Sequence, residues 1–251
     1  MLDILKYKIV VFDLDGTIYY GDKIIDGAND VIKYFKKNGI KVYFVTNNSV
    51  KKRAQIYDKL IEMGIDCNED EVINSGLVSS FMINKLEIKN LYVFGSDNLK
   101  MELIDNKVNV TDEIEKAKNL IIGYNPDFNY NDLTQAVRVA LKADKIIACN
   151  EDRLFPGNKG EIYPGCGAMV APVIFCAKRK VDYFIGKPNP LMIEMIASKN
   201  NVNMDDILVI GDNYETDIKM AIDSKCSSIY IGKEIYDNTT CVKTLKEILV
   251  L

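Results

Sequence analysis

Short apolar runs that end in polar residues recur along the chain and alternate with segments of helical spacing. Strands that are buried on both faces are apolar throughout, whereas strands with one solvent-exposed face alternate between apolar and polar positions. The continuous runs therefore predict parallel strands that are covered on both faces. The runs are residues 9–12, 42–45, 91–94, 120–122, 145–149, 183–185, 207–210 and 228–231.

Helices are predicted between these runs, at 28–39, 51–64, 131–143 and 190–200. In the first of them Val31, Ile32 and Phe35 fall on one face, and Gly39 suits the left-handed position that ends many helices. Strands that alternate with helices in this way predict an α/β fold.

Polar clusters follow four of the runs directly, and they suggest how the chain divides into domains. The strands between roughly 85 and 165 end without such charged groups. In open parallel sheets the chemistry lies at the carboxyl ends of the strands. We therefore expect a catalytic core of residues 1–82 plus 182–251, with a second α/β unit, residues 83–181, inserted into it.

Composition narrows the class of protein. The chain has 251 residues, 48% of them apolar and 27% charged, as in ordinary globular proteins. The net charge of −4 is mixed along the chain, so we expect neither a nucleic-acid polymer nor a membrane as partner. No apolar run approaches the ~18 residues of a membrane span, and the N-terminus lacks a signal-peptide pattern. We expect a cytoplasmic protein with reduced, mostly buried cysteines.

Histidine is absent from the sequence. Its absence excludes Ser-His-Asp and Cys-His catalysis and most zinc chemistry. Catalysis must therefore depend on acidic, amine, hydroxyl or thiol side chains, or on a hard metal ion bound by oxygen.

The first polar cluster, DLDG at 13–16, places Asp13 and Asp15 at the end of the first predicted strand. Two clustered carboxylates raise the pKa of one of them unless a cation compensates, so a bound Mg²⁺ is a natural partner. One carboxylate could then act as a nucleophile and the other as a general acid and base. For an isolated DxDG, an ordinary turn would be the favoured interpretation. An EF-hand loop is excluded, because its glycine is the sixth residue and Gly16 is the fourth.

Three other strand ends carry groups that suit a phosphate or a metal ion. Thr46 could hold a phosphate oxygen, although capping the next helix would explain it as well. Lys187, in the stiff GKPNP turn, could neutralise phosphate charge or could be a surface lysine. In GDNYETD, Asp212 is placed as a metal ligand, and Asp217 could support it or favour a helix N-terminus.

The order DxDGT, T, K and GDxxxTD resembles the four motifs of the haloacid dehalogenase-like superfamily of phosphatases. Further segments are similar to the class IIA members, the NagD-like or p-nitrophenylphosphatase-like group, and they cover nearly the whole chain. These segments are GTIYYGDKIIDGA, TNNS, GYNPDFNYNDL, CNEDRLFP, PGCGAMVA and GKPNP. The resemblance implies a Rossmann-like parallel-sheet core with an inserted C2-type α/β cap domain.

The resemblance also implies a role for each motif residue. Asp13 would be the nucleophile that forms an aspartyl-phosphate, and Asp15 would protonate the leaving alcohol and then activate water. Mg²⁺ would be held by the carboxylates of Asp13 and Asp212 and by the backbone carbonyl of Asp15, with Asp217 in support. Thr46, the backbone at Asn47, and Lys187 would bind the phosphoryl group.

Substrate choice is expected to lie in the cap, at Asn150, Asp152 and Phe155 of the loop 149–160. Pyridoxal phosphatases of this class carry histidine where this chain has Phe155, which argues against pyridoxal phosphate. The expected substrates are small soluble phosphates such as nucleotides, sugar phosphates and p-nitrophenyl phosphate. Proteins of the resembling group also lead us to expect a homodimer formed through the cap.

Two alternatives remain open. A receiver-like signalling module also clusters Asp, Thr and Lys, but receivers are single compact domains without an inserted cap. A phosphosugar-binding protein that has lost catalysis would retain the fold, although the set of acidic and basic residues is complete here.

Overall fold

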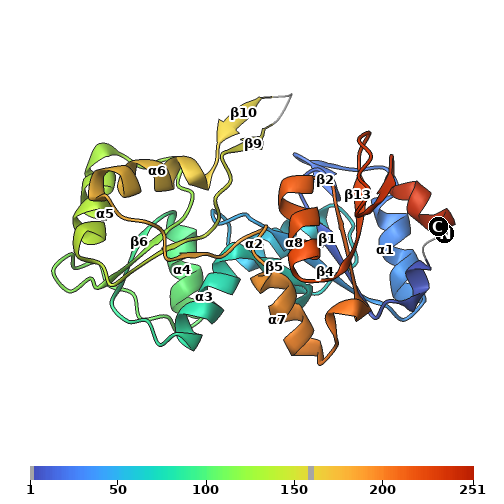
Figure 1. The fold of residues 1–251 in the computed structure, drawn as a ribbon, viewed down its shortest axis with the longest axis horizontal. Coiled ribbons are helices and arrows are strands. Elements are labelled where there is room, and N and C mark those ends of the chain that lie inside the picture. The colour runs from blue at the N-terminus through green and yellow to red at the C-terminus, as the bar shows by residue number, and fades with distance from the viewer. Residues whose placement is uncertain (1–2, 158–160) are drawn as a thin grey trace. The chain divides into compact units, whose positions relative to one another are not determined.

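The computed structural model of the protein describes residues 3–157 and 161–251. The chain forms two compact units (Figure 1). The first consists of Met1–Thr46, Ala54–Ile73 and Lys187–Leu251, and the second of Asn47–Arg53 and Asn74–Gly186. Both contain a parallel sheet with helices, so the predicted α/β fold is confirmed. The domain boundaries expected from the sequence, 1–82 plus 182–251 and 83–181, stay a prediction.

The first unit is built on a six-stranded sheet in the order β14-β13-β12-β1-β4-β5, in which β14 to β4 pair in parallel. The strand β1 lies between β12 and β4, so polar residues at the ends of these three strands meet at one edge of the sheet. The strands are β1 (Ile9–Asp13), β4 (Lys41–Thr46), β5 (Val72–Asn74), β12 (Ile207–Gly211), β13 (Ser227–Ile231) and β14 (Thr240–Val242). A short antiparallel hairpin, β2 (Tyr19–Tyr20) and β3 (Lys23–Ile24), follows β1.

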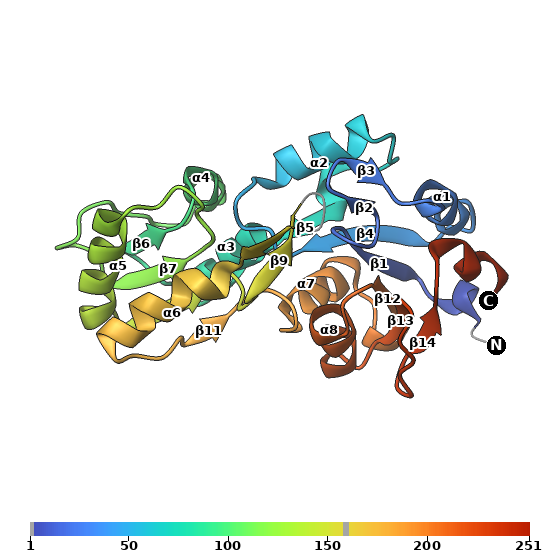
Figure 2. The same cartoon turned by 90° about the horizontal axis from the view of Figure 1, so that it is seen from above.

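Helices cover both faces of this sheet (Figure 2). On one face lie α1 (Ala28–Lys37) and α2 (Arg53–Glu62), and on the other α7 (Leu191–Asn200) and α8 (Lys219–Asp223). Val10 and Phe12 of β1 share one hydrophobic core with Phe35 of α1. Because side chains alternate along a strand, Asp13 points to the opposite face from Phe12. Shorter turns are η1 (Ile4–Lys6), η2 (Glu69–Glu71), η4 (Met204–Asp206), η6 (Leu245–Val250) and the π-helical η5 (Tyr214–Ile218).

The second unit contains a four-stranded sheet in the order β11-β8-β7-β6, with every pair parallel. Its strands are β6 (Leu91–Phe94), β7 (Asn119–Ile122), β8 (Lys145–Ala148) and β11 (Tyr183–Phe184). The helices α3 (Ser75–Lys85) and α4 (Asp97–Asp105) pack together on one face, and α5 (Tyr130–Lys142) and α6 (Cys166–Ala177) on the other. An antiparallel hairpin, β9 (Leu154–Pro156) and β10 (Ile162–Pro164), completes the unit.

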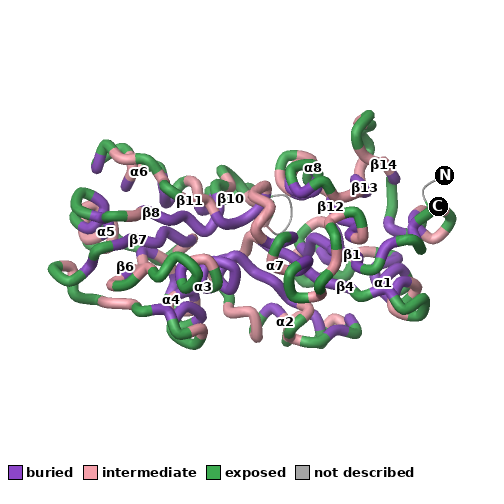
Figure 3. Tube along the Cα trace, turned by 60° about the horizontal axis from the view of Figure 1, so that its bottom comes forward, coloured by how far each residue is buried: buried purple, intermediate pink, exposed green. Residues whose placement is uncertain are grey.

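Every apolar run singled out in the sequence forms a strand, and the four helices predicted between the runs also form. The strands β1 and β7 are buried along their whole length, as the apolar runs 9–12 and 120–122 within them predict (Figure 3). The runs did not predict α3 and α4, or the three-residue strands β5 and β14. Among the helices of the described residues, none is long and apolar enough to cross a membrane.

Candidate active site

Strand order in the first unit brings three of the predicted site residues to one edge of the sheet. Asp13 is the last residue of β1, Thr46 is the last residue of β4, and Asp212 directly follows β12. Asp13 and Thr46 are buried, with 6% and 4% of their surface exposed, while Asp212 is half-buried. The sheet order alone therefore gathers residues that lie almost 200 positions apart in the chain.

Lys187 is a buried ammonium that joins two carboxylates. Its Nζ donates to Oδ1 of Asp13 and, over 2.7 Å, to Oδ1 of Asp217. The other carboxylate oxygen of Asp217 accepts the backbone N–H of Asn213 at 3.1 Å. Only 4% of Lys187 is exposed, so the alternative interpretation as a surface lysine is wrong. Asp217, 1% exposed, lies in the first turn of η5 and also accepts the N–H of the residue that precedes this turn, so it occupies a helix start as well as the ion pair.

The electrostatics of the cluster follow from this burial. Burial raises the pKa of Asp13, the charges of Asp217 and Asp212 raise it further, and Lys187 opposes both effects. Burial alone would lower the pKa of Lys187, but the carboxylates of Asp13 and Asp217 outweigh it and raise that pKa, so the ammonium stays charged. The pKa of Asp212 is also raised, by burial first and by Asp217 second.

The donor set fits a hard divalent cation. One carboxylate oxygen from each of Asp13, Asp212 and Asp217 lies within 4.8 Å of the others, and one ammonium does not neutralise three carboxylates. Oxygen-rich clusters with excess negative charge are the sites that Mg²⁺ prefers. Asp217, predicted only as a supporting residue, belongs to this group of carboxylates, while the expected contribution of Asp15 is its backbone carbonyl.

Two residues of the first motif, Gly16 and Thr17, shape the position of Asp212. Thr17 donates its hydroxyl to Oδ1 of Asp212 at 2.8 Å and is 1% exposed. Gly16 has a φ of +96°, and a Cβ placed on it would lie 2.3 Å from Oδ2 of Asp212. Glycine at this position therefore allows both the left-handed turn and the close approach of the carboxylate.

The side chain of Asp15 lies beyond the end of β1 and is exposed. One of its carboxylate oxygens accepts a hydrogen bond from the Tyr19 hydroxyl, with 3.4 Å between the two oxygens. A role for Tyr19 could not be predicted from the sequence, because its contact with Asp15 forms only when the hairpin β2–β3 folds back over the end of β1.

In the second unit, Asn47 forms a partly buried hydrogen-bonded network with two of the predicted cap residues. Its side-chain amide donates to both carboxylate oxygens of Asp152, at 3.1 and 3.0 Å. Its carbonyl accepts the Asn150 amide at 2.7 Å and the Ser75 hydroxyl at 3.0 Å. Asn150 in turn accepts the backbone N–H of Asp152 at 3.1 Å. The network fixes Asn47, which directly follows Thr46 in the chain.

Phe155 of β9 packs between two other aromatic rings of the second unit. Its ring centroid lies 5.3 Å from that of Tyr124 and 5.6 Å from that of Tyr163. Residues 158–160 of the same loop lie outside the described residues. Roles for Asn150, Asp152 and Phe155 in substrate choice stay a prediction.

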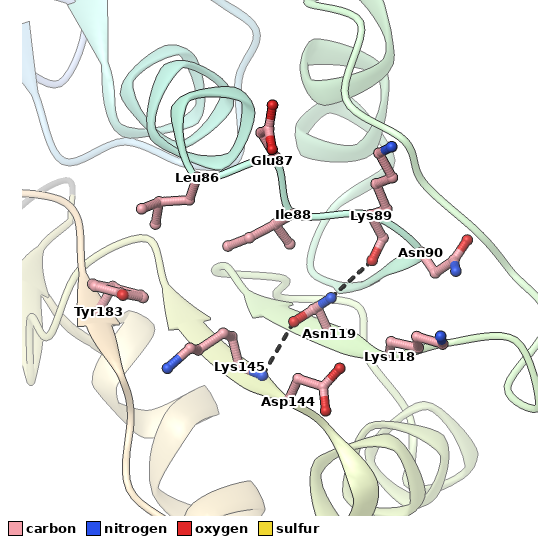
Figure 4. A pocket seen from close by; sticks show the side chains of 10 residues that line it. All are labelled: Leu86, Glu87, Ile88, Lys89, Asn90, Lys118, Asn119, Asp144, Lys145 and Tyr183. Atoms are coloured by element: carbon pink, nitrogen blue, oxygen red, sulfur yellow. Dashed lines mark hydrogen bonds between the residues drawn. The ribbon is translucent and has the colours of Figure 1, made fainter.

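A cavity of about 480 Å³ opens at the amino ends of the strands of the second unit (Figure 4). It is lined by none of the residues predicted for the site. Asn119, at its centre, donates to the carbonyl of Lys89 and accepts from the backbone of Lys145, so its amide is satisfied on both sides. One of the lining lysines, Lys145, pairs with Asp182 at 3.3 Å.

Comparisons with known proteins agree with the chemistry of the first unit. Residues 10–109 match the family model described as haloacid dehalogenase-like hydrolase, and residues 184–248 match a second one, described as HAD-hydrolase-like. An acid sugar phosphatase of Staphylococcus haemolyticus is 31% identical, over 96% of this chain and 90% of the relative. The sugar-phosphatase AraL of Bacillus subtilis is 32% identical, over 84% of this chain and 78% of the relative.

Solved structures extend the likeness to the whole fold. A protein described as a putative nagD protein superposes with a TM-score of 0.92 at 25% identity, covering 100% of this chain and 99% of that one. The 4-nitrophenylphosphatase of Thermotoga maritima gives a TM-score of 0.91 at 25% identity, with 98% of each chain covered. The chain belongs to the haloacid dehalogenase-like hydrolases, and within them it is a phosphatase. The predicted resemblance to the NagD-like group is confirmed.

Proposed function

We propose that the protein hydrolyses phosphate monoesters of small soluble molecules by passing the phosphoryl group through Asp13. The observation that carries this proposal is the buried Lys187, which holds the Asp13 carboxylate at the sheet edge where Thr46 and Asp212 also lie. A buried carboxylate with an adjacent fixed cation is a positioned nucleophile, and phosphoryl transfer depends chiefly on positioning and charge compensation.

The proposed reaction has two steps. A carboxylate oxygen of Asp13 attacks phosphorus, the bond from phosphorus to the ester oxygen breaks, and the leaving oxygen takes a proton from the Asp15 carboxyl. Asp15 then takes a proton from water, the resulting hydroxide attacks phosphorus, and the bond between Asp13 and phosphorus breaks. Inorganic phosphate and the alcohol are the products, and both aspartates return to their starting states.

The remaining residues bind the phosphoryl group. The Thr46 hydroxyl, the Asn47 backbone N–H and the Lys187 ammonium would contact its oxygens. Carboxylates of Asp13 and Asp212 and the carbonyl of Asp15 would hold Mg²⁺, with Asp217 supporting the site through Lys187. When bound, the cation supplies positive charge that offsets the charge on the phosphoryl oxygens.

Sugar phosphates and p-nitrophenyl phosphate are the proposed substrates, because similar proteins carry these activities in their names. Nucleotides belong in the same test. A homodimer formed through the cap and a cytoplasmic location stay predictions. The receiver and binding-protein alternatives are disfavoured, because the similar proteins are described as phosphatases and the carboxylate pair of the first motif is complete.

The test is a release assay for inorganic phosphate over a panel of sugar phosphates, nucleotides and p-nitrophenyl phosphate, with Mg²⁺ and with a chelator. Asp13→Asn is expected to lower turnover by a factor on the order of a thousand while the protein stays folded. The control is Asp58→Asn, on the exposed face of α2, which is expected to retain full turnover. Mg²⁺-dependent turnover by Asp13→Asn would refute the nucleophile, and turnover unaffected by the chelator would refute the metal requirement.

A further inference from the structure

Tyr19 is a buried tyrosine whose hydroxyl meets the carboxylate of Asp15. It is 4% exposed, and its hydroxyl oxygen lies 3.4 Å from Oδ2 of Asp15. A tyrosine hydroxyl is protonated at neutral pH, so it donates the hydrogen bond to the carboxylate. Hydrogen bonds of catalytic groups are often long before substrate binds and shorten in the complex.

The backbone of the first motif forces this contact. The N–H of Tyr19 donates to the carbonyl of Leu14 at 3.1 Å, and the N–H of Gly16 donates to the carbonyl of Tyr19 at 2.8 Å. Asp15 and Tyr19 also form an isolated β-bridge. The chain therefore returns on itself within five residues, and the tyrosine ring is carried back beside the aspartate.

The ring of Tyr19 is also in contact with a lysine. Nζ of Lys59, on α2, lies 3.8 Å from the ring centroid and donates to the carbonyl of Gly21 at 2.8 Å. A cation over an aromatic face is attracted by the ring, and the second contact ties the same ammonium to the hairpin. The phenol is consequently fixed in place, with its hydroxyl directed at the exposed carboxylate of Asp15.

We propose that Tyr19 is a positioning residue for Asp15. The hydrogen bond from its hydroxyl holds the Asp15 carboxyl where it can reach the leaving oxygen, and Lys59 keeps the phenol in place. The proposal rests on the proposed function, because it assigns Asp15 as the proton donor. A general acid contributes only when it is held within hydrogen-bond reach of the group that it protonates.

The experiment compares Tyr19→Phe with Tyr20→Phe on two substrates that differ in the leaving group. Tyr20 is the next residue of the same strand and 44% exposed, so it is a matched control outside the site. The p-nitrophenolate ion leaves without a proton, whereas the alkoxide of a sugar phosphate needs one. We expect Tyr19→Phe to lower kcat/KM for the sugar phosphate about tenfold. For p-nitrophenyl phosphate, kcat/KM should fall by less than about twofold. Tyr20→Phe should change neither value.

A double variant separates positioning from a general structural defect. In an Asp15→Asn background, Tyr19→Phe should cause no further loss on the sugar phosphate, because the group that it positions is gone. Equal losses on the two substrates, or a full tenfold loss in the Asp15→Asn background, would overturn the proposal. Failure of the wild-type protein to hydrolyse either ester would instead refute the proposed function, so the two failures are distinguishable.

Discussion

Replacing Lys187 by methionine tests the charge balance of the site. The Nζ of Lys187 forms ion pairs with Asp13 and Asp217, and the side chains of all three residues are at most 8% exposed. Lys187→Met keeps most of the volume of the side chain but leaves two buried carboxylates without their cation. Removing one partner of a buried ion pair costs about 3–5 kcal/mol of unfolding free energy, which is roughly 6–20 °C in Tm for a chain of this size.

The matched control is Lys8→Met. Lys8 pairs with Asp206 at 3.0 Å, similar to the 2.7 Å between Lys187 and Asp217, but its side chain is 64% exposed. Exposed ion pairs contribute between about 0 and 1 kcal/mol, so the control should unfold within about 4 °C of the wild type. Both variants remove a lysine that contacts an aspartate, so the difference between them reports burial together with the second carboxylate that Lys187 contacts.

The assay is thermal unfolding followed by circular dichroism, with a chelator present so that no divalent cation compensates the carboxylates. A second variant, Lys187→Met with Asp217→Asn, should be more stable than Lys187→Met alone, because it removes one of the uncompensated charges. Equal Tm values for Lys187→Met and Lys8→Met would refute the reasoning. So would a double variant that is less stable than the single one.

Two other predictions concern hydrogen bonds to site residues. Thr17→Val removes the hydrogen-bond donor to Asp212. It should raise the Mg²⁺ concentrations needed for half-maximal activity and for half-maximal stabilisation of Tm by about 10- to 100-fold. Thr17→Ser keeps the hydroxyl and should retain the wild-type values. Unchanged Mg²⁺ dependence in Thr17→Val would contradict a metal role for Asp212. Asp152→Ala removes both oxygens that accept the Asn47 amide, and it should lower the free energy of unfolding, measured with a denaturant, by about 1–3 kcal/mol. The control Glu151→Ala, at the exposed neighbouring residue, should change this free energy little. A matching loss in both variants would mean that the bonds to Asn47 do not stabilise the fold.

The strands and the residues at their ends could be predicted from the sequence because each depends on local pattern. An apolar run such as IVVF reports burial on both faces, and Asp13 follows it directly. Parallel pairing then places the ends of β1, β4 and β12 at one edge without further information. The site residues of the first unit are predictable for this reason.

Other elements carry too little local signal. The helix α3 is buried at Ser75–Ser80, so it shows no polar face by which helical periodicity could reveal it. The strand β5 has only three residues. The pairing of Asn47 with Asp152 joins positions 105 residues apart, and the contact of Tyr19 with Asp15 depends on the hairpin β2–β3. Such contacts follow from the tertiary fold and leave no pattern in the sequence.

Transfer of the phosphoryl group to Asp13 is the central claim, and a single-turnover trapping experiment tests it most directly. The protein is mixed with excess Mg²⁺ and an equimolar phosphate ester, quenched in acid within one turnover, digested and measured by mass spectrometry. We predict that the peptide containing Asp13 gains the mass of one phosphoryl group, and that Asp13→Asn shows no gain. Phosphate release without any phosphorylated peptide, or a phosphoryl group found on another residue, would contradict the account.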